Sequence, residues 1–224
     1  MTTSTSIEPH LFWILSRGAG TTALVLSSIS VCVGLVMAGR LTPGDATGRR
    51  AYHEILSLSV IVAIAVHGLV LVGDGVLHPS LLDVTVPFAW SYMRWATTLG
   101  IVAGWALIFL GLSFYARGRI GRRRWKVIHR LTVLAWLGGI VHTIVEGTDA
   151  GTLWYIALLV ATTAPALALL AVRIIRSPRD FGLGQKRPRP RGLQIPRSDT
   201  RLESTRDAPP HRSLFDQHAR TRSR

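Results

Sequence analysis

This sequence has little cysteine and little negative charge. It contains one cysteine, Cys32, so no intramolecular disulfide, cysteine-based zinc site or iron–sulfur cluster can form. Acidic residues number 12 against 26 lysines and arginines, which gives the 224-residue chain a formal net charge of +14. Hydrophobic residues nevertheless make up 48% of the chain. A soluble domain is rarely so apolar and so basic at once, which argues against that class of protein.

The apolar residues gather in long runs that contain almost no charge. A helix needs about 20 consecutive, mostly apolar residues to cross a bilayer, more than a buried helix in a soluble core requires. Five runs meet this requirement and predict an all-α integral membrane protein, folded as a five-helix transmembrane bundle. The predicted spans are residues 18–38, 53–73, 95–115, 128–145 and 153–174.

The charge of each connection predicts the orientation of the bundle. Three arginines lie between the first two spans, and six lysines and arginines lie in residues 117–126. By the positive-inside rule, both connections face the cytoplasm. Residues 74–93 contain two aspartates and no lysine or arginine, and residues 146–152 are also acidic, so both segments face outward. We therefore expect the N-terminus outside and the C-terminus in the cytoplasm.

The chain divides into a membrane domain, residues 1–175, and a basic cytoplasmic tail, residues 176–224. From residue 173 onward there are 14 basic and 5 acidic residues. The tail has too few apolar residues to offset the entropy of ordering, which predicts disorder. A basic segment beside a bilayer is expected to bind anionic headgroups. Nucleic acid is not an expected partner, because no aromatic stacking platform accompanies the charge.

Four of the eight histidines lie in, or at the ends of, just two of the predicted spans. His53 and His67 are 14 residues apart in the second span, and His129 and His142 are 13 apart in the fourth. At 1.5 Å per residue these separations are about 21 and 20 Å, most of the apolar thickness of a bilayer. Both spans are expected to run from inside to outside. His53 and His129 therefore share an inner level, and His67 and His142 share an outer level.

A metal held by two neutral imidazoles must take its remaining ligands from a cofactor. Haem supplies four equatorial nitrogens and leaves two axial positions, whereas zinc normally requires a third or fourth protein ligand. The paired histidines predict two bis-histidine haems b, with His53 and His129 on the inner iron and His67 and His142 on the outer iron. The alternative is one haem and two incidental histidines, because a single intramembrane histidine is often a hydrogen-bonded polar group between helices.

The spacing in the fourth span does not suit two ligands on one straight helix. At about 100° per residue, 14 residues return to within about 40° of the starting face, but 13 residues leave the second side chain about 140° away. Gly138 and Gly139 lie between His129 and His142. A local distortion at these glycines would restore the alignment.

Arg17 and Arg94 are the only lysines or arginines expected at the outer face, where the neighbouring connections are acidic. Haem propionates are anions that need a cation or water near each face. We therefore expect at least one of the two arginines to pair with an outer propionate or to orient an anionic acceptor.

Around these residues the sequence resembles the ferric reductase-like transmembrane domain superfamily, which includes NADPH oxidases, ferric reductases and the haem subunit of a methionine sulfoxide reductase system. Two histidines on each of two helices, at these spacings, match the oxidase and ferric reductase pattern. Shorter stretches look like the short actinobacterial members: SRGAG at 16–20, VPF at 86–88 followed by Tyr92 and Arg94, RIG at 119–121 leading through Trp125 to His129, and GTD at 147–149. The resemblance covers residues 13–173.

This resemblance implies electron transfer across the membrane through two haems, in a multi-pass protein of the plasma membrane. It also implies that Trp136, which lies between the two histidine levels, packs between the haem groups. A position facing lipid or another helix is equally consistent with the sequence around Trp136.

The chain also departs from the oxidases and ferric reductases, which have six spans and a C-terminal flavin and nicotinamide domain. Here five spans are followed by a short tail that contains no glycine-rich dinucleotide motif. The expected electron donor is therefore a separate flavoprotein or dehydrogenase, or a membrane quinol, and the chain is expected to be one component of an oxidoreductase. The alternative is a haem-binding or structural subunit that anchors a redox partner without turnover of its own.

Overall fold

The structure, a computed structural model, describes residues 8–39, 45–75 and 77–176. These residues form eight helices and no strand. Five helical segments are long and apolar enough to cross a membrane, which confirms the predicted all-α fold and the number of spans. The chain is therefore a multi-pass membrane protein. From residue 177 onward, the tail that we predict to be disordered lies outside the described residues.

The first, second and fourth spans begin earlier in the chain than the sequence predicts. The first helix begins at residue 8 rather than 18, because the apolar residues 11–15 also belong to it, and the second begins at residue 46 rather than 53, because it continues into polar residues before the apolar run. The fourth span consists of two helices, α6 and α7, and the short helices α3 and α5 belong to the connections. In chain order the helices are α1 (Glu8–Gly39), α2 (Ala46–Val72), α3 (Leu81–Thr85), α4 (Arg94–Leu112), α5 (Arg117–Ile120), α6 (Arg122–His129), α7 (Thr132–Glu146) and α8 (Leu153–Arg176).

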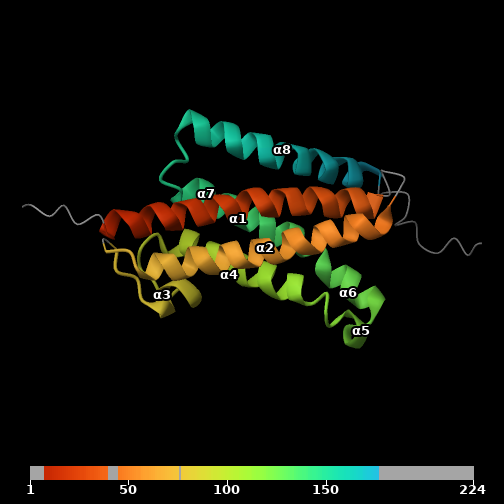
Figure 1. Cartoon of the computed structure of the whole chain (residues 1–224), viewed down its shortest axis with the longest axis horizontal. Helices are drawn as coiled ribbons and strands as arrows, with labels where there is room; N and C mark the ends of the chain where they lie inside the picture. Colours follow the sequence, from red (N-terminus) through yellow and green to blue (C-terminus); the bar gives the residue numbers. More distant parts are fainter. Residues whose placement is uncertain (1–7, 40–44, 76, 177–224) are drawn as a thin grey trace, which may run out of the picture. The chain divides into compact units, whose positions relative to one another are not determined.

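Helix α1 is central to the packing of the bundle. It packs along α2 and along α8, while α4 packs along α7. Further contacts of α1 with α7 and of α2 with α4 join these groups. Figure 1 shows α1 and α2 side by side along most of their length, running in opposite directions.

Most of the apolar surface of the spans faces away from the protein interior. In the most apolar stretch of each span, only 11% to 28% of the residues are buried. Large apolar side chains such as Leu69, Phe109 and Leu153 are exposed. Lipid tails are as apolar as these side chains, so the helices associate through close packing and hydrogen bonds rather than through a hydrophobic driving force.

Side-chain hydrogen bonds cap the N-terminal ends of α2 and α3. The Asp45 carboxylate caps α2 by accepting from the backbone N–H groups of Gly48 and Thr47, at 2.9 and 2.8 Å, and these bonds lower its pKa. Ser80 and Asp83 form a capping box at the start of α3. Hydrogen bonds from the hydroxyl and the backbone N–H of Ser80 lower the pKa of the Asp83 carboxyl.

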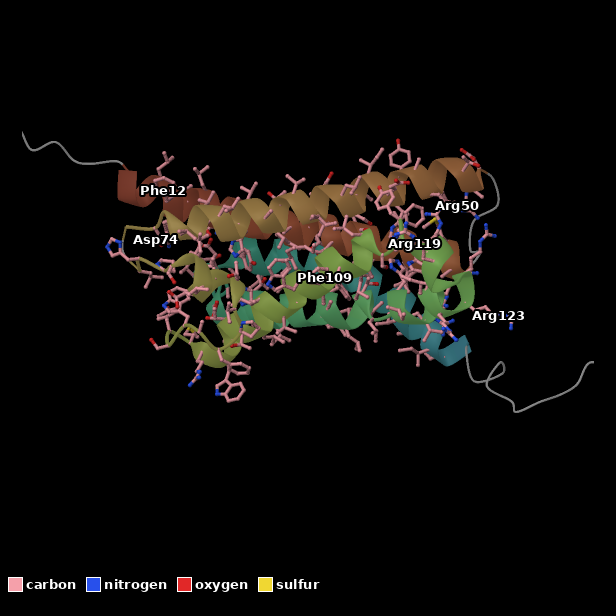
Figure 2. The ribbon with its side chains drawn as sticks, turned by 90° about the horizontal axis from the view of Figure 1, so that it is seen from below. Phe12, Arg50, Asp74, Phe109, Arg119 and Arg123 are labelled. Carbon is pink, nitrogen blue, oxygen red and sulfur yellow. The ribbon has the colours of Figure 1, made fainter. Side chains whose placement is uncertain are left out.

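The two ends of the helices differ in charge. Figure 2 shows Arg50 and Arg119 at one end, hereafter the basic end, and Asp74 at the other, hereafter the acidic end. At the basic end the Tyr115 hydroxyl donates a hydrogen bond of 2.7 Å to the Glu54 carboxylate, which raises the pKa of the phenol. This bond connects α2 to the chain that follows α4.

The fourth span is interrupted directly after His129, where α6 ends. The backbone N–H groups of Arg130 and Leu131 donate to carbonyls three residues earlier, instead of the four residues typical of an α-helix. Helix α7 then begins at Thr132. Our expectation of a distortion at Gly138 and Gly139 is wrong, because both lie inside the continuous helix α7. Turns with three residues advance about 120° per residue rather than 100°. A single regular helix therefore does not relate the two histidines of this span.

The connection between α2 and α4 has an unusual backbone. His78, Phe88 and Met93 have positive φ angles of 46°, 65° and 36°, a region that few residues other than glycine adopt. The Phe88 N–H donates to the Thr98 hydroxyl at 2.9 Å, and the Trp105 indole N–H donates to the last carbonyl of α3 at 2.8 Å. These bonds hold the connection over the acidic end of the bundle.

Candidate functional site

The four histidines of the spans come together as two pairs at different levels. His53 on α2 faces His129 at the end of α6, with ring centroids 6.2 Å apart and ring planes at 88°. His67 on α2 and His142 on α7 line one cavity. We call these the His53–His129 pair, nearer the basic end, and the His67–His142 pair, nearer the acidic end.

A cavity of about 570 Å³ lies at the His67–His142 pair. Its walls are mostly apolar and come from α1, α2, α4 and α7, and residues of the connection from Leu77 to Tyr92 also line it. Sites for cofactors and small ligands typically have about 300–1,000 Å³. The cavity is therefore large enough for an organic cofactor placed beside the two rings.

Backbone carbonyls determine which nitrogen carries the proton in the His67–His142 pair. The Nδ1 of His67 lies 2.8 Å from the carbonyl oxygen of Ser16, and the Nδ1 of His142 lies 3.0 Å from that of Ala96. Because a carbonyl oxygen can only accept, each Nδ1 carries the proton and donates it. The Nε2 atom of each ring therefore keeps its lone pair for a ligand.

A chain of serine hydroxyls assigns the proton of His53 in the same way. The Ser57 hydroxyl donates to the backbone carbonyl of His53 at 2.7 Å, so it can only accept from the Ser30 hydroxyl at 3.2 Å. Ser30 has then used its single proton and accepts from the His53 Nδ1, also at 3.2 Å. Nε2 of His53 is left unprotonated. Metal-bound histidines share this pattern, in which the other ring nitrogen donates a hydrogen bond.

His129 is oriented by stacking instead. The Trp125 ring lies over it with centroids 4.9 Å apart and planes at 22°, and the Trp125 indole N–H donates to the Ser113 hydroxyl at 3.1 Å. The His129 Nδ1 is buried and makes no hydrogen bond of normal geometry, although the Leu110 carbonyl lies nearby. Buried polar atoms are seldom left without a partner, so this ring is a candidate for a further ligand.

Small residues of α1 face the two histidines of α2 in a repeated arrangement. A Cβ at Gly20 would lie 3.1 Å from the His67 ring, and a Cβ at Gly34 would lie 3.3 Å from the His53 ring. The serine that contacts each ring precedes its glycine by four residues. The two Ser/Gly sets on α1 are 14 residues apart, and so are the two histidines on α2. Because the helices are antiparallel and the spacings are equal, each set lies opposite one histidine.

This repeat is a sequence signal that we did not use. Ser-x-x-x-Gly occurs at residues 16–20 and again at 30–34, with the same spacing of 14 residues as His53 and His67. An equal spacing on two neighbouring helices indicates that one helix supplies the same contacts twice. Ser30 and Gly34 are therefore functional candidates that the sequence analysis did not name, whereas Ser16 and Gly20 lie in its SRGAG stretch.

Gly100 of α4 has the closest contact with a histidine ring among the described glycines. A Cβ at this position would lie 2.5 Å from the His142 Nδ1 and 2.6 Å from its Cε1. Non-bonded heavy atoms do not approach so closely, so any side chain here would displace the ring. The absence of a side chain allows His142 to reach the Ala96 carbonyl.

A carboxylate also faces His142. Glu146, one turn later on α7, places its Oε2 3.4 Å from the His142 Nδ1. Its Oε1 accepts a short hydrogen bond from the Thr97 hydroxyl. We had assigned Glu146 only to an acidic connection, although its position four residues after His142 puts both side chains on one helix face.

The two arginines predicted at the outer face differ in position. Arg17 lines the cavity, where it forms an ion pair with Asp149 and lies 4.0 Å over the ring of Trp13. Arg94 is exposed, lies 5.8 Å from the centre of the Phe88 ring, and is not among the residues that line the cavity. Of the two, the structure brings only Arg17 to the His67–His142 pair.

Trp136 is buried between helices and does not face lipid. Its exposed fraction is 1%, and its indole N–H donates to the Ser28 hydroxyl at 3.0 Å. That hydroxyl donates in turn to the Leu24 carbonyl at 2.8 Å. The two bonds attach α7 to α1 at a level between the two histidine pairs.

The spacing of the His53–His129 pair fits a metal-containing group held between two imidazoles. Metal–nitrogen bonds of about 2 Å on opposite sides of one ion place the two ring centroids about 6 Å apart. The His53–His129 centroids are 6.2 Å apart. Among the described residues, no three or more His, Cys, Asp or Glu side chains cluster closely enough to hold a metal ion. A metal bound at one of these pairs would therefore take further ligands from a cofactor such as haem.

The fold and the site define a class of protein: a helical membrane protein with five spans and two partly buried histidine pairs at different depths. Comparisons of the chain with protein-family models, with curated proteins and with solved structures found no match.

Proposed function

We propose that this chain is the membrane cytochrome b subunit of an oxidoreductase system, a ferric reductase-like protein that carries electrons across the plasma membrane through two bis-histidine haems. One observation carries the proposal. His53, His67 and His142 each donate from Nδ1, so each presents an unprotonated Nε2. When bound between such a pair, haem supplies one-electron chemistry at its iron.

The side chains of the protein would bind, orient and shield the cofactors. Each histidine pair would hold one cofactor through its two imidazoles, and the carbonyls, hydroxyls and stacked tryptophan described above hold the rings in place. Trp136 fills the space between the two levels and excludes water. Arg17 is the cation placed to bind a propionate, which would compete with Asp149 for its guanidinium.

The proposed reaction transfers electrons singly between partners on the two faces. One electron enters at the basic end from a reduced flavin or a quinol, and one electron leaves at the acidic end to an acceptor. The donor is oxidised by one electron for each electron that the acceptor gains. No side chain of the protein is consumed, so its contribution is positioning and the tuning of reduction potentials.

The proposed function is tested by the visible spectrum of the purified protein. We expect the bands of low-spin haem b, which change on addition of dithionite, with about two haems per chain. Protein purified from haem-sufficient cells without any haem would contradict the proposal. Haem that dithionite reduces but no physiological donor reduces would favour the anchor subunit instead.

We propose that the basic end faces the cytoplasm and that the N-terminus lies outside. This orientation is supported by the charge difference between the two ends of the helices (Figure 2). Reporter fusions at Gly121, between α5 and α6, and at the C-terminus are expected to be cytoplasmic. A fusion at Ser80, before α3, is expected outside. A reporter at Gly121 that is accessible from outside would invert the scheme.

We also expect the purified chain to oxidise NADPH no faster than background. Adding a cognate flavoprotein should reduce the haems, because the cations of the basic end suit an anionic partner as well as lipid headgroups. Raised ionic strength should slow this reduction if docking is electrostatic. The measurement is stopped-flow absorbance at increasing salt concentration. Salt-insensitive reduction by a quinol analogue alone would contradict the flavoprotein donor.

A further inference from the structure

The hydrogen bonds to the two histidine pairs are unequal. In the His67–His142 pair both Nδ1 groups donate to backbone carbonyls, at 2.8 and 3.0 Å. In the His53–His129 pair one Nδ1 donates to a hydroxyl at 3.2 Å and the other makes no hydrogen bond of normal geometry. A stronger acceptor for the Nδ1 proton makes the ring more basic. A more basic ring stabilises the oxidised, more positive state of a bound metal.

Fixed negative charge also lies at the His67–His142 pair. The Oε2 of Glu146 is 3.4 Å from the His142 Nδ1, and the Glu146 side chain is only 16% exposed. Asp74 and Asp149 line the same cavity. Arg17, the cation of this cavity, forms an ion pair with Asp149 rather than with Glu146. In a region of low dielectric, a carboxylate this close to a ligand opposes the addition of an electron.

The other pair lies beside basic segments of the sequence. Arg130 directly follows His129, and three consecutive arginines begin α6. Glu54 is next to His53 in the sequence, but its carboxylate accepts a hydrogen bond from the Tyr115 hydroxyl at 2.7 Å. Cations near a metal favour its electron-rich, reduced state. Hydrogen bonding and charge therefore act in the same direction at both pairs.

We propose that the His67–His142 pair holds its iron at the lower of the two reduction potentials, and that Glu146 is the positioning residue responsible for most of the difference. The inference rests on the proposed function. Glu146 acts through His142, whose Nδ1 lies 3.4 Å from the Glu146 Oε2. Electrons that enter at the basic end then move energetically uphill between the pairs. An inside-negative membrane potential drives electrons outward and would supply the missing driving force.

The test is a redox titration of the purified full-length protein, followed at the visible haem bands. We expect two one-electron transitions in the unaltered protein, and only the upper one in His67→Ala. Glu146→Gln removes the charge at nearly constant shape. It should raise the midpoint potential of the lower transition by about 59 mV, which corresponds to a factor of about ten in the equilibrium constant for one electron. Glu54→Gln, the same exchange near the other pair, should leave the lower transition unchanged.

Three results would overturn the inference: a lower transition that survives in His67→Ala, a lower transition unmoved by Glu146→Gln, or an equal shift in Glu54→Gln. If Glu146→Gln fails to retain its haem, Glu146→Asp decides, because it keeps the charge but moves it away from His142. An upward shift in Glu146→Asp supports the inference, and no shift overturns it. Unaltered protein without haem would contradict the proposed function itself, which separates the two failures.

Discussion

Replacing His142 with alanine is expected to halve the haem content of the purified protein, from about two haems per chain to about one. The substitution removes one of two axial nitrogens at the His67–His142 pair and leaves the cavity otherwise intact. The His53–His129 pair, about 20 Å away along the helices, keeps both of its ligands. The measurement is the ratio of extracted haem to protein.

Further variants separate loss of a ligand from general damage. His53→Ala is expected to remove the other haem, and a His67→Ala/His142→Ala double variant should lose no more haem than either single variant. His218→Ala, the same exchange in the tail, should retain full haem content. Unchanged haem content in all four single variants of the paired histidines would rule out the ligand assignment.

Replacing Gly100 with alanine is expected to lower the haem content nearly as far, although no ligand is changed. The added Cβ would lie 2.5 Å from the His142 Nδ1, so the ring must leave the Ala96 carbonyl. The displaced ring would no longer present Nε2 to the cavity. Haem content and the low-spin bands of the remaining haem are the quantities to measure.

Gly18→Ala is the matched control, because it makes the same exchange in a helix where a Cβ meets nothing within 4 Å. Exchanging a mid-helix glycine for alanine there should stabilise the helix by about 0.5–1 kcal/mol and leave haem binding unchanged. Full haem content and an unchanged spectrum in Gly100→Ala would show that the close approach of the ring is unnecessary.

Properties that depend on consecutive residues could be predicted from the sequence. Each span is recognisable because crossing a bilayer requires a long apolar run, whichever helices surround it. The bounds are less accurate, since a helix can continue into polar residues, as α2 does before residue 53. The interruption after His129 was not predicted, because no proline or glycine lies at Arg130 or Leu131 to indicate it.

The sequence by itself determined the all-helical class, the five spans, the charge difference between the connections and the two levels of histidines, because length, charge and spacing are properties of the chain alone. Only the tertiary structure decided which atoms meet. The hydrogen bond to Ser30 assigned the ring proton of His53, and the cavity turned out to be lined by Arg17 but not by Arg94. The structure also placed the Glu146 carboxylate beside His142, where it accepts a hydrogen bond from the Thr97 hydroxyl. Except for Glu146 and His142, which share α7, these residues meet across different helices, so their contacts follow from the register and rotation of each helix against its neighbours.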